Sequence, residues 1–128
     1  MYLNELSSKI IGSAIEVHRT LGPGLLESAY EESLCYELDL RNIPYNRQFP
    51  VPVVYKGKHL DCGYRIDVLV GKKVVVELKA CEAIQPIHRA QILTYLKLMD
   101  LRLGLLLNFN VELMKDGITR VINGQIDH

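Results

Sequence analysis

Residues 66–80 read IDVLVGKKVVVELKA, two apolar runs joined by a Gly-Lys-Lys segment at residues 71–73. Runs rich in Val, Ile and Leu that flank a glycine turn predict a β-hairpin. Three charged residues, Asp67, Glu77 and Lys79, interrupt these runs. Because an unpaired buried charge is strongly unfavourable, their placement needs a chemical reason. Two carboxylates converging beside a lysine indicate a site for a divalent metal ion.

The register across the turn decides whether the two carboxylates meet. Side chains of a strand alternate between its faces, so Glu77 and Lys79 point the same way. A two-residue loop would place Asp67 opposite Val76, on the wrong face, whereas a three-residue loop at residues 71–73 would place Asp67 opposite Glu77. The metal-site hypothesis therefore requires the three-residue register, or an equivalent bulge, with Cβ atoms about 5 Å apart.

Mg²⁺, for which Mn²⁺ can substitute, prefers oxygen ligands. Asp67, Glu77 and the main-chain carbonyl of Leu78 are the expected ligands. The metal would polarise a scissile phosphate and lower the pKa of a water, while Lys79 would orient or deprotonate that water and stabilise charge on the phosphate. The alternative interpretation is a cross-strand ladder of salt bridges on a solvated sheet face.

The composition is that of a globular protein, with 128 residues, 48% hydrophobic and 23% charged. We expect one domain over residues 1–128. No apolar run is long enough to cross a membrane, and residues 1–5 lack the features of a signal peptide. The three cysteines form neither a CxxC pair nor a convincing disulfide framework, so a cytoplasmic protein without membrane contact is expected.

The net charge is zero, with 15 basic and 15 acidic residues, which argues against strong non-specific binding of nucleic acid. The basic residues nevertheless gather in the middle of the chain, and the acidic residues in its first third. This asymmetry favours a middle segment that faces phosphate. Its basic members are Arg47, Lys56, Lys58, His59, Arg65, Lys72, Lys73 and Lys79.

Helical periodicity marks three segments. Apolar residues recur every three or four positions from Leu3 to Leu21, and Gly22-Pro23-Gly24 ends this pattern. A second helix is expected over about residues 25–41, with Glu27 on or beside its inward face, where it could deliver a further carboxylate to the site. A third is expected over residues 86–99, beginning at a proline, with Ile87, Gln91, Tyr95 and Leu98 on one face.

The remaining patterns predict strands. A nearly all-apolar run at residues 103–109 is typical of a buried central strand, and the helix before it implies a right-handed crossover to a parallel pairing. The predicted order is ααβββαβ with a C-terminal hairpin, an α/β sandwich around a mixed central sheet. The other strands are expected at residues 50–55, 59–70 and 74–80, and the closing hairpin at residues 111–114 and 118–122, with its turn at Asp116-Gly117.

Three motifs carry a family resemblance. Asp67 with Glu77-Leu78-Lys79 resembles the core of the PD-(D/E)XK nuclease superfamily, although Ile66 stands where the family name has proline. Gln91 and Tyr95 match the QxxxY element of nucleases similar to RecB. Residues 24–30, GLLESAY, are similar to the small GxxExxY family of that superfamily.

The resemblance implies a restriction-endonuclease-like fold and Mg²⁺-dependent hydrolysis of phosphodiester bonds, in DNA sooner than in RNA. It makes Glu27 the helical acid of the active site, and gives Gln91 and Tyr95 the task of positioning the phosphate or Lys79. Two alternatives stay open: a catalytically inactive module that binds nucleic acid or another partner, and a small-molecule phosphoesterase. The small size suggests that a homodimer or a partner completes the substrate surface.

Overall fold

The computed structural model describes residues 1–125, so the last three residues of the expected domain lie outside the described chain. Two helices, α1 (Leu3–Leu21) and α2 (Glu27–Leu40), come first, and α3 (Pro86–Met99) interrupts the strands that follow. The strands are β1 (Tyr45–Pro50), β2 (Val53–Tyr55), β3 (Lys58–Leu60), β4 (Arg65–Val70), β5 (Val74–Lys79), β6 (Leu103–Asn108) and β7 (Ile118–Ile122), and a 3₁₀ helix, η1 (Met114–Gly117), precedes β7.

The main sheet is mixed, as predicted. Its five strands lie in the order β1-β4-β5-β6-β7. Only β5 and β6 run parallel, and α3 makes the crossover between them, whereas the other neighbours are antiparallel. Every residue of β6 is buried, which confirms the central position expected from its apolar sequence. The three predicted helices are all present.

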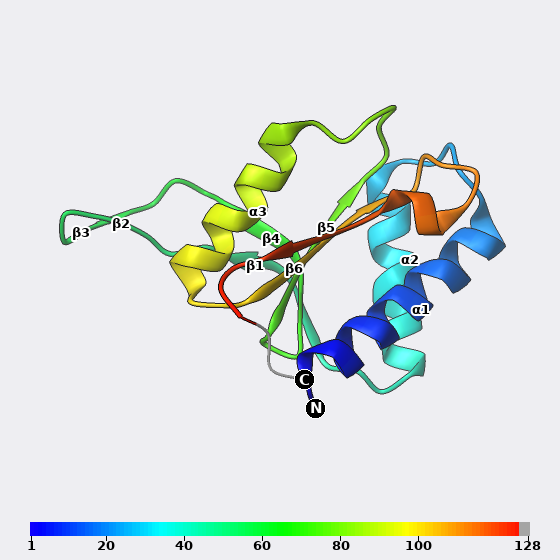
Figure 1. The fold of residues 1–128 in the computed structure, drawn as a ribbon, viewed down its shortest axis with the longest axis horizontal. Helices are drawn as coiled ribbons and strands as arrows, with labels where there is room; N and C mark the ends of the chain where they lie inside the picture. The colour runs from blue at the N-terminus through cyan, green and yellow to red at the C-terminus, as the bar shows by residue number, and fades with distance from the viewer. Residues whose placement is uncertain (126–128) are drawn as a thin grey trace.

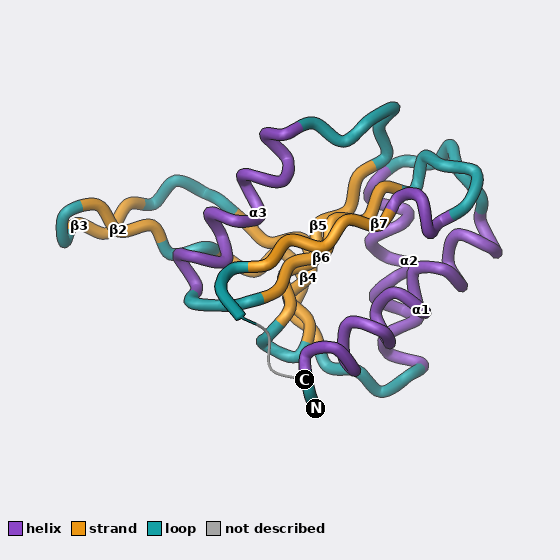
Figure 2. Tube along the Cα trace, viewed as in Figure 1, coloured by secondary structure: helices purple, strands orange, loops and turns teal. Residues whose placement is uncertain are grey.

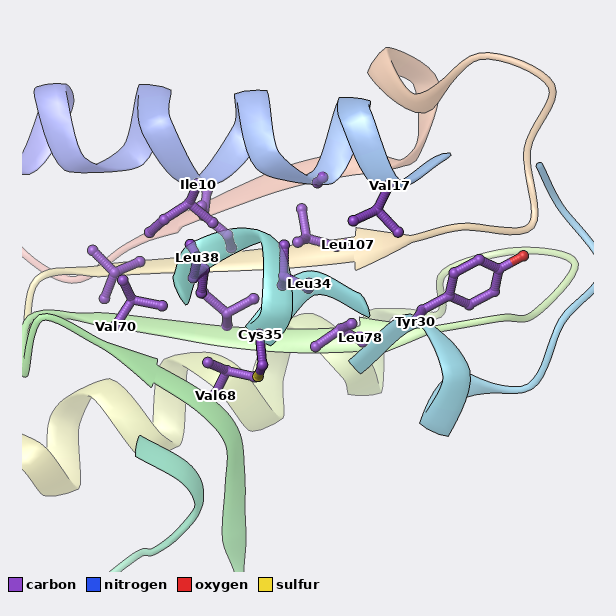
Figure 3. Close-up of a cluster of buried hydrophobic side chains, with 14 of the residues drawn as sticks. Ile10, Val17, Tyr30, Leu34, Cys35, Leu38, Val68, Val70, Leu78 and Leu107 are labelled. Carbon is purple, nitrogen blue, oxygen red and sulfur yellow. The ribbon is translucent and has the colours of Figure 1, made fainter. Parts of the chain in front are cut away.

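Helices cover both faces of the sheet (Figure 1). On one face, α1 and α2 pack through Ile10 and Leu34 against Val68, Leu78 and Leu107 (Figure 3). On the opposite face, α3 packs on a second apolar cluster that includes Leu69, Val75, Ile92, Leu96 and Leu106. Side chains of β5 alternate between these clusters, with Val74, Val76 and Leu78 on the α1–α2 side. Glu77 and Lys79 thereby fall on the α3 side.

The turn between α1 and α2 is held by a buried tyrosine. The hydroxyl of Tyr30 donates a hydrogen bond to the Gly22 carbonyl (2.6 Å) and accepts one from the Leu25 N–H (3.1 Å). Its ring stacks on Phe109, with ring centroids 4.4 Å apart. The tyrosine of the GLLESAY motif therefore has a structural task, which is to set where α2 begins.

The first part of the sheet differs from the prediction. The expected strand at residues 50–55 is split, because Val51 and Pro52 separate β1 from β2, and proline has no N–H for a ladder. The expected strand at residues 59–70 is also interrupted, by residues 61–64, where Gly63 has a positive φ of 71°. β2 and β3 form a separate two-stranded ribbon that projects from the body (Figure 2).

The predicted C-terminal hairpin is wrong in its first half. The segment at residues 111–114 is not a strand, and β7 pairs directly with β6. Buried His18 binds the carbonyl oxygen of Val111 at 2.7 Å, and Met114 enters the α1–α2 core. Gly117 lies so close to β6 that a Cβ there would stand 1.9 Å from the Asn108 carbonyl oxygen. These tertiary contacts favour a 3₁₀ turn over a strand.

All three cysteines are free, as expected. Burial raises the pKa of the Cys35 thiol to about 12, so this side chain is a packing residue in the core. No helix within residues 1–125 is long and apolar enough to span a membrane.

Gly104 allows α3 to approach the sheet, and Gly104→Ala tests this contact. A Cβ at this position would lie 2.4 Å from Cγ2 of Ile92, which is fully buried and cannot move aside freely. We expect a loss of about 1–3 kcal/mol in the free energy of unfolding, as for other overpacked cores, measured by urea denaturation.

Gly12→Ala in α1 is the matched control. Its Cβ would meet only the end of the flexible Arg41 side chain, at 3.2 Å. Alanine in a helix interior is more favourable than glycine by about 0.5–1 kcal/mol. Equal destabilisation by the two substitutions would contradict a specific contact between Gly104 and α3.

Candidate active site

The register across the β4–β5 turn is the one that the metal-site hypothesis requires. Val70 pairs with Val74 and Val68 with Val76, so the loop consists of residues 71–73. The N–H of Lys73 donates to the Val70 carbonyl at 3.0 Å and closes this loop. Continued by one residue, the same register sets Asp67 opposite Glu77.

Beyond the Val68–Val76 pair, two side-chain carboxylates replace the backbone hydrogen bonds between β4 and β5. The main-chain N–H of Asp67 donates to Oε2 of Glu77 at 3.1 Å. In the other direction, the N–H of Leu78 donates to Oδ2 of Asp67 at 3.0 Å. Each acid thus binds the backbone of the opposite strand. The exchange holds both carboxylates in the gap between β4 and β5.

β4 is irregular at Asp67 on its other side too. Its ladder with β1 pairs Val68 with Arg47 and Ile66 with Phe49, and omits Asp67 together with Gln48. Gln48 has a positive φ of 51°. Ile66 packs in the α3-side cluster, whereas Val68 packs in the other. β4 therefore departs from strict alternation at Asp67, as strands do at bulges.

Glu31 of α2 supports this irregular stretch. Its carboxylate accepts hydrogen bonds from Nη2 of Arg47 at 2.8 Å and from Nε2 of Gln48 at 2.8 Å. Its partners lie 16 and 17 residues away, on a strand that the pattern did not reveal.

Glu77 is buried and Asp67 beside it is half-buried, and the charge of the pair is poorly compensated. Glu77 is 5% exposed. Burial, followed by contact with the Asp67 carboxyl, raises the pKa of Glu77 to about 9, against the opposing effects of the Asp67 N–H and the Lys79 charge. None of the ion pairs found within residues 1–125 involves Asp67, Glu77 or Lys79. The site is therefore not a solvated ladder of salt bridges.

The chain after Lys79 is fixed by Asn108, a residue that sequence reasoning missed. Asn108 is buried at the end of β6 and pairs with half-buried Lys79 in the parallel register. Its side-chain amide donates to the Cys81 carbonyl (2.9 Å) and accepts from the Cys81 N–H (3.2 Å). A polar residue that ends an apolar strand was the available signal, since the carboxyl ends of parallel strands meet at one edge.

α3 brings the two residues of the QxxxY element to this side of the sheet. Tyr95 is buried, and Gln91, one turn earlier, is exposed. Burial raises the pKa of the Tyr95 phenol, and the nearby negative charges of Glu77, Tyr64 and Asp67 add to the shift. Gln91 and Tyr95 line one cavity with Ile87 and Leu98, the residues predicted to share their helix face.

Glu27 does not join the acid pair. It is exposed at the first residue of α2, not on an inward face, and α2 lies across the sheet from α3. Within residues 1–125, no three His, Cys, Asp or Glu side chains are gathered so that they could hold a metal ion. The donors brought together are Asp67 and Glu77, with the backbone of Leu78 between them and Lys79 beside them.

The helices on both faces of a mixed sheet, with an acid pair and a lysine on its central hairpin, define a restriction-endonuclease-like protein. A family model described as the PD-(D/E)XK nuclease superfamily matches residues 4–121, and the chain belongs to that superfamily. No curated protein and no solved structure matches the chain.

The raised pKa of Glu77 predicts how stability depends on pH when metal is absent. Folded Glu77 holds its proton up to about pH 9, whereas the unfolded side chain releases it near 4.5. The folded state therefore binds more protons between these values, and the free energy of unfolding should fall as the pH rises. Urea denaturation in EDTA at pH 5 and pH 8 measures this.

Glu77→Gln should remove this dependence and stabilise the metal-free protein at pH 8 by at least about 1.4 kcal/mol, the free energy of one pKa unit. The amide oxygen can still accept the Asp67 N–H. The control is Glu82→Gln, at an exposed position. A variant that keeps the wild-type pH dependence would contradict a protonated Glu77.

Proposed function

We propose that this protein is a metal-dependent nuclease that hydrolyses phosphodiester bonds in nucleic acid, with DNA as the expected substrate ahead of RNA. The observation that carries the proposal is the exchange in which Asp67 and Glu77 each accept a main-chain N–H from the opposite strand. This arrangement holds two acids side by side although their repulsion is unfavourable. A divalent cation between them would remove the repulsion.

The donor set fits Mg²⁺ or Mn²⁺. The carboxylates are hard oxygen ligands of the kind these ions prefer. The N–H of Leu78 points into the gap toward Asp67, and in an extended strand the carbonyl of the same residue points to the same side. The Leu78 carbonyl is therefore our third ligand. When bound, the cation would polarise the phosphodiester and lower the pKa of a water.

In this proposal Lys79 acts on the reacting phosphate. The water oxygen would attack phosphorus and release a proton to solvent. The bond from phosphorus to the leaving oxygen would break, that oxygen would take up a proton from solvent, and no covalent enzyme intermediate would form. Lys79 follows Glu77 by two residues on the same strand, so both side chains lie on the α3 side of the sheet. Its ammonium would orient the water and stabilise the negative charge that develops on the phosphate oxygens.

Gln91 and Tyr95 would position the phosphate or Lys79, since both line the cavity beside α3 and Tyr95 lies near the acid pair. Glu27 is proposed as an assisting acid that reaches the substrate from outside the acid pair, because it is exposed at the start of α2. We also propose that the chain belongs to the GxxExxY group, on the basis of residues 24–30. The hydrogen bonds of Tyr30 to Gly22 and Leu25 support this assignment because they give the tyrosine of the motif a structural role. A homodimer would place a second site across a duplex.

A second candidate is a catalytically inactive module that binds nucleic acid on the same fold. The observation that favours it is the lack of a third acid beside Asp67 and Glu77 within residues 1–125. Tight binding of DNA without any cleavage would support this candidate over the nuclease.

Metal binding can be measured without catalysis. Mg²⁺ or Mn²⁺ at millimolar concentration should raise the melting temperature of the wild type, because a ligand that binds only the folded state stabilises it. Asp67→Asn should abolish the increase, since it removes one charged ligand. The control Asp116→Asn, at an exposed position of η1, should respond as the wild type does. An equal response of both variants would contradict the ligand assignment.

Cleavage is tested by nicking of plasmid and of single-stranded DNA with Mg²⁺ or Mn²⁺. We expect Lys79→Ala to lower the rate by about 10²–10³-fold, the usual contribution of one group that stabilises charge in the transition state. The control is Lys9→Ala, at an exposed position of α1, which should cleave at the wild-type rate. Absence of cleavage by the wild type with either metal, or equal rates for the two variants, would overturn the nuclease proposal.

A further inference from the structure

The β2–β3 ribbon, residues 53–60, is a basic arm. Its strands pair only with each other, and Lys56 and Gly57, with φ of 47° and 82°, form a tight turn at its tip. Residues 53–60 include no acid, while Lys56, Lys58 and His59 are exposed. A two-stranded ribbon that stands alone is marginally stable in water. Its projection from the body (Figure 2) therefore suggests a binding task.

A cavity of about 300 Å³ lies between the base of the arm and α3. Val53 and Tyr64 form its arm side, and Ile87, Gln91, Tyr95 and Leu98 form its helix side. Ile87 is 69% exposed at the rim, and Tyr64 is 48% exposed. A cavity that combines apolar walls with a few polar groups is typical of sites for small organic ligands.

The aromatic residues of the cavity connect it to the acid pair. The rings of Tyr64 and Tyr95 have centroids 6.2 Å apart and are tilted by 58°. Because the two rings are not stacked in parallel, Tyr95 does not occupy the stacking face of Tyr64. Tyr95 lies near Asp67 and Glu77 as well as lining the cavity. A nucleotide with its phosphate at the acid pair would have this cavity within reach of its base.

We propose that the cavity binds one unpaired nucleobase, stacked on Tyr64 beside the Gln91 amide, while Lys56 and Lys58 of the arm bind neighbouring phosphates. This rests on the proposed function. A base within a duplex has both faces covered by its neighbours, so only an unpaired base can stack on Tyr64. Aromatic rings beside lysines are the usual means of binding single strands. The substrate class is therefore nucleic acid with unpaired nucleotides.

The test is binding of a fluorescently labelled 12-nucleotide single strand, against the blunt duplex of the same sequence, in EDTA so that no metal-dependent cleavage occurs. The wild type should bind the single strand about tenfold or more tightly than the duplex. Tyr64→Ala should weaken single-strand binding about tenfold, the effect of losing a stacked base. Tyr64→Phe, which keeps the ring, should bind like the wild type.

Two controls separate stacking from damage to the fold. Tyr36→Ala removes another exposed tyrosine, on α2 across the sheet, and should not change binding. A single strand with abasic positions should lose affinity for the wild type but not further for Tyr64→Ala. Lys58→Ala should weaken binding and flatten its salt dependence, whereas Lys9→Ala on α1 should not.

Equal losses for Tyr64→Ala and Tyr36→Ala, or duplex binding as tight as single-strand binding, would overturn the base site. Its failure can be told apart from that of the nuclease. Loss of binding on Tyr64→Ala in a protein that never cleaves DNA would keep the base site and remove the nuclease. Metal-dependent cleavage by a protein that binds the single strand and the duplex equally well would keep the nuclease proposal and remove the base site.

Discussion

The hydrogen bonds that Asp67 and Glu77 accept across the gap between β4 and β5 are the constraint on which the site depends. Beyond Val68 and Val76 the backbone ladder ends, and the carboxylates take its place. Because each acid binds a main-chain N–H, its side chain cannot turn away to solvent. The two acids, one buried and one half-buried, are consequently kept together in a way that favours a proton or a cation between them. Stability of the metal-free hairpin is reduced as a result, which is the usual compromise at functional sites.

The surrounding fold makes this arrangement rigid. β5 lies between β4 and β6 in the sheet, with helices on both faces, so Lys79 extends from an interior strand. Asn108 fixes the chain just after it by pairing with the backbone of Cys81. On the other side, Glu31 holds the irregular part of β1 against α2. Functional groups placed on strands are positioned more accurately than groups on loops.

The proposed substrate contact would depend on a different kind of structure. The exposed side chains of the arm at residues 53–60 include Tyr55, Lys56, Lys58 and His59, whereas the acid pair lies within the packed body. Such an arm would let a chain with no net charge present a local basic surface to phosphate. Seven of the fifteen acidic residues lie on α1 and α2, and two of them form local ion pairs, Glu16 with Arg19 and Glu37 with Arg41.

The sequence by itself determined the elements with strong periodicity. The apolar runs of β5 and β6, the stripe of α1 and the proline start of α3 specify their structures locally, and the three-residue register followed from the need to unite Asp67 with Glu77. Tertiary structure alone decided the rest. β1 is a polar edge strand whose pairing depends on β4 and on Glu31, so no local pattern reveals it. Residues 111–114 have strand-like sequence, but contacts with His18 and the core bend them into a turn. The exposure of Glu27 likewise depends on how α2 packs against the sheet. Helical periodicity identifies the apolar face of a helix, but it does not specify which element packs against that face.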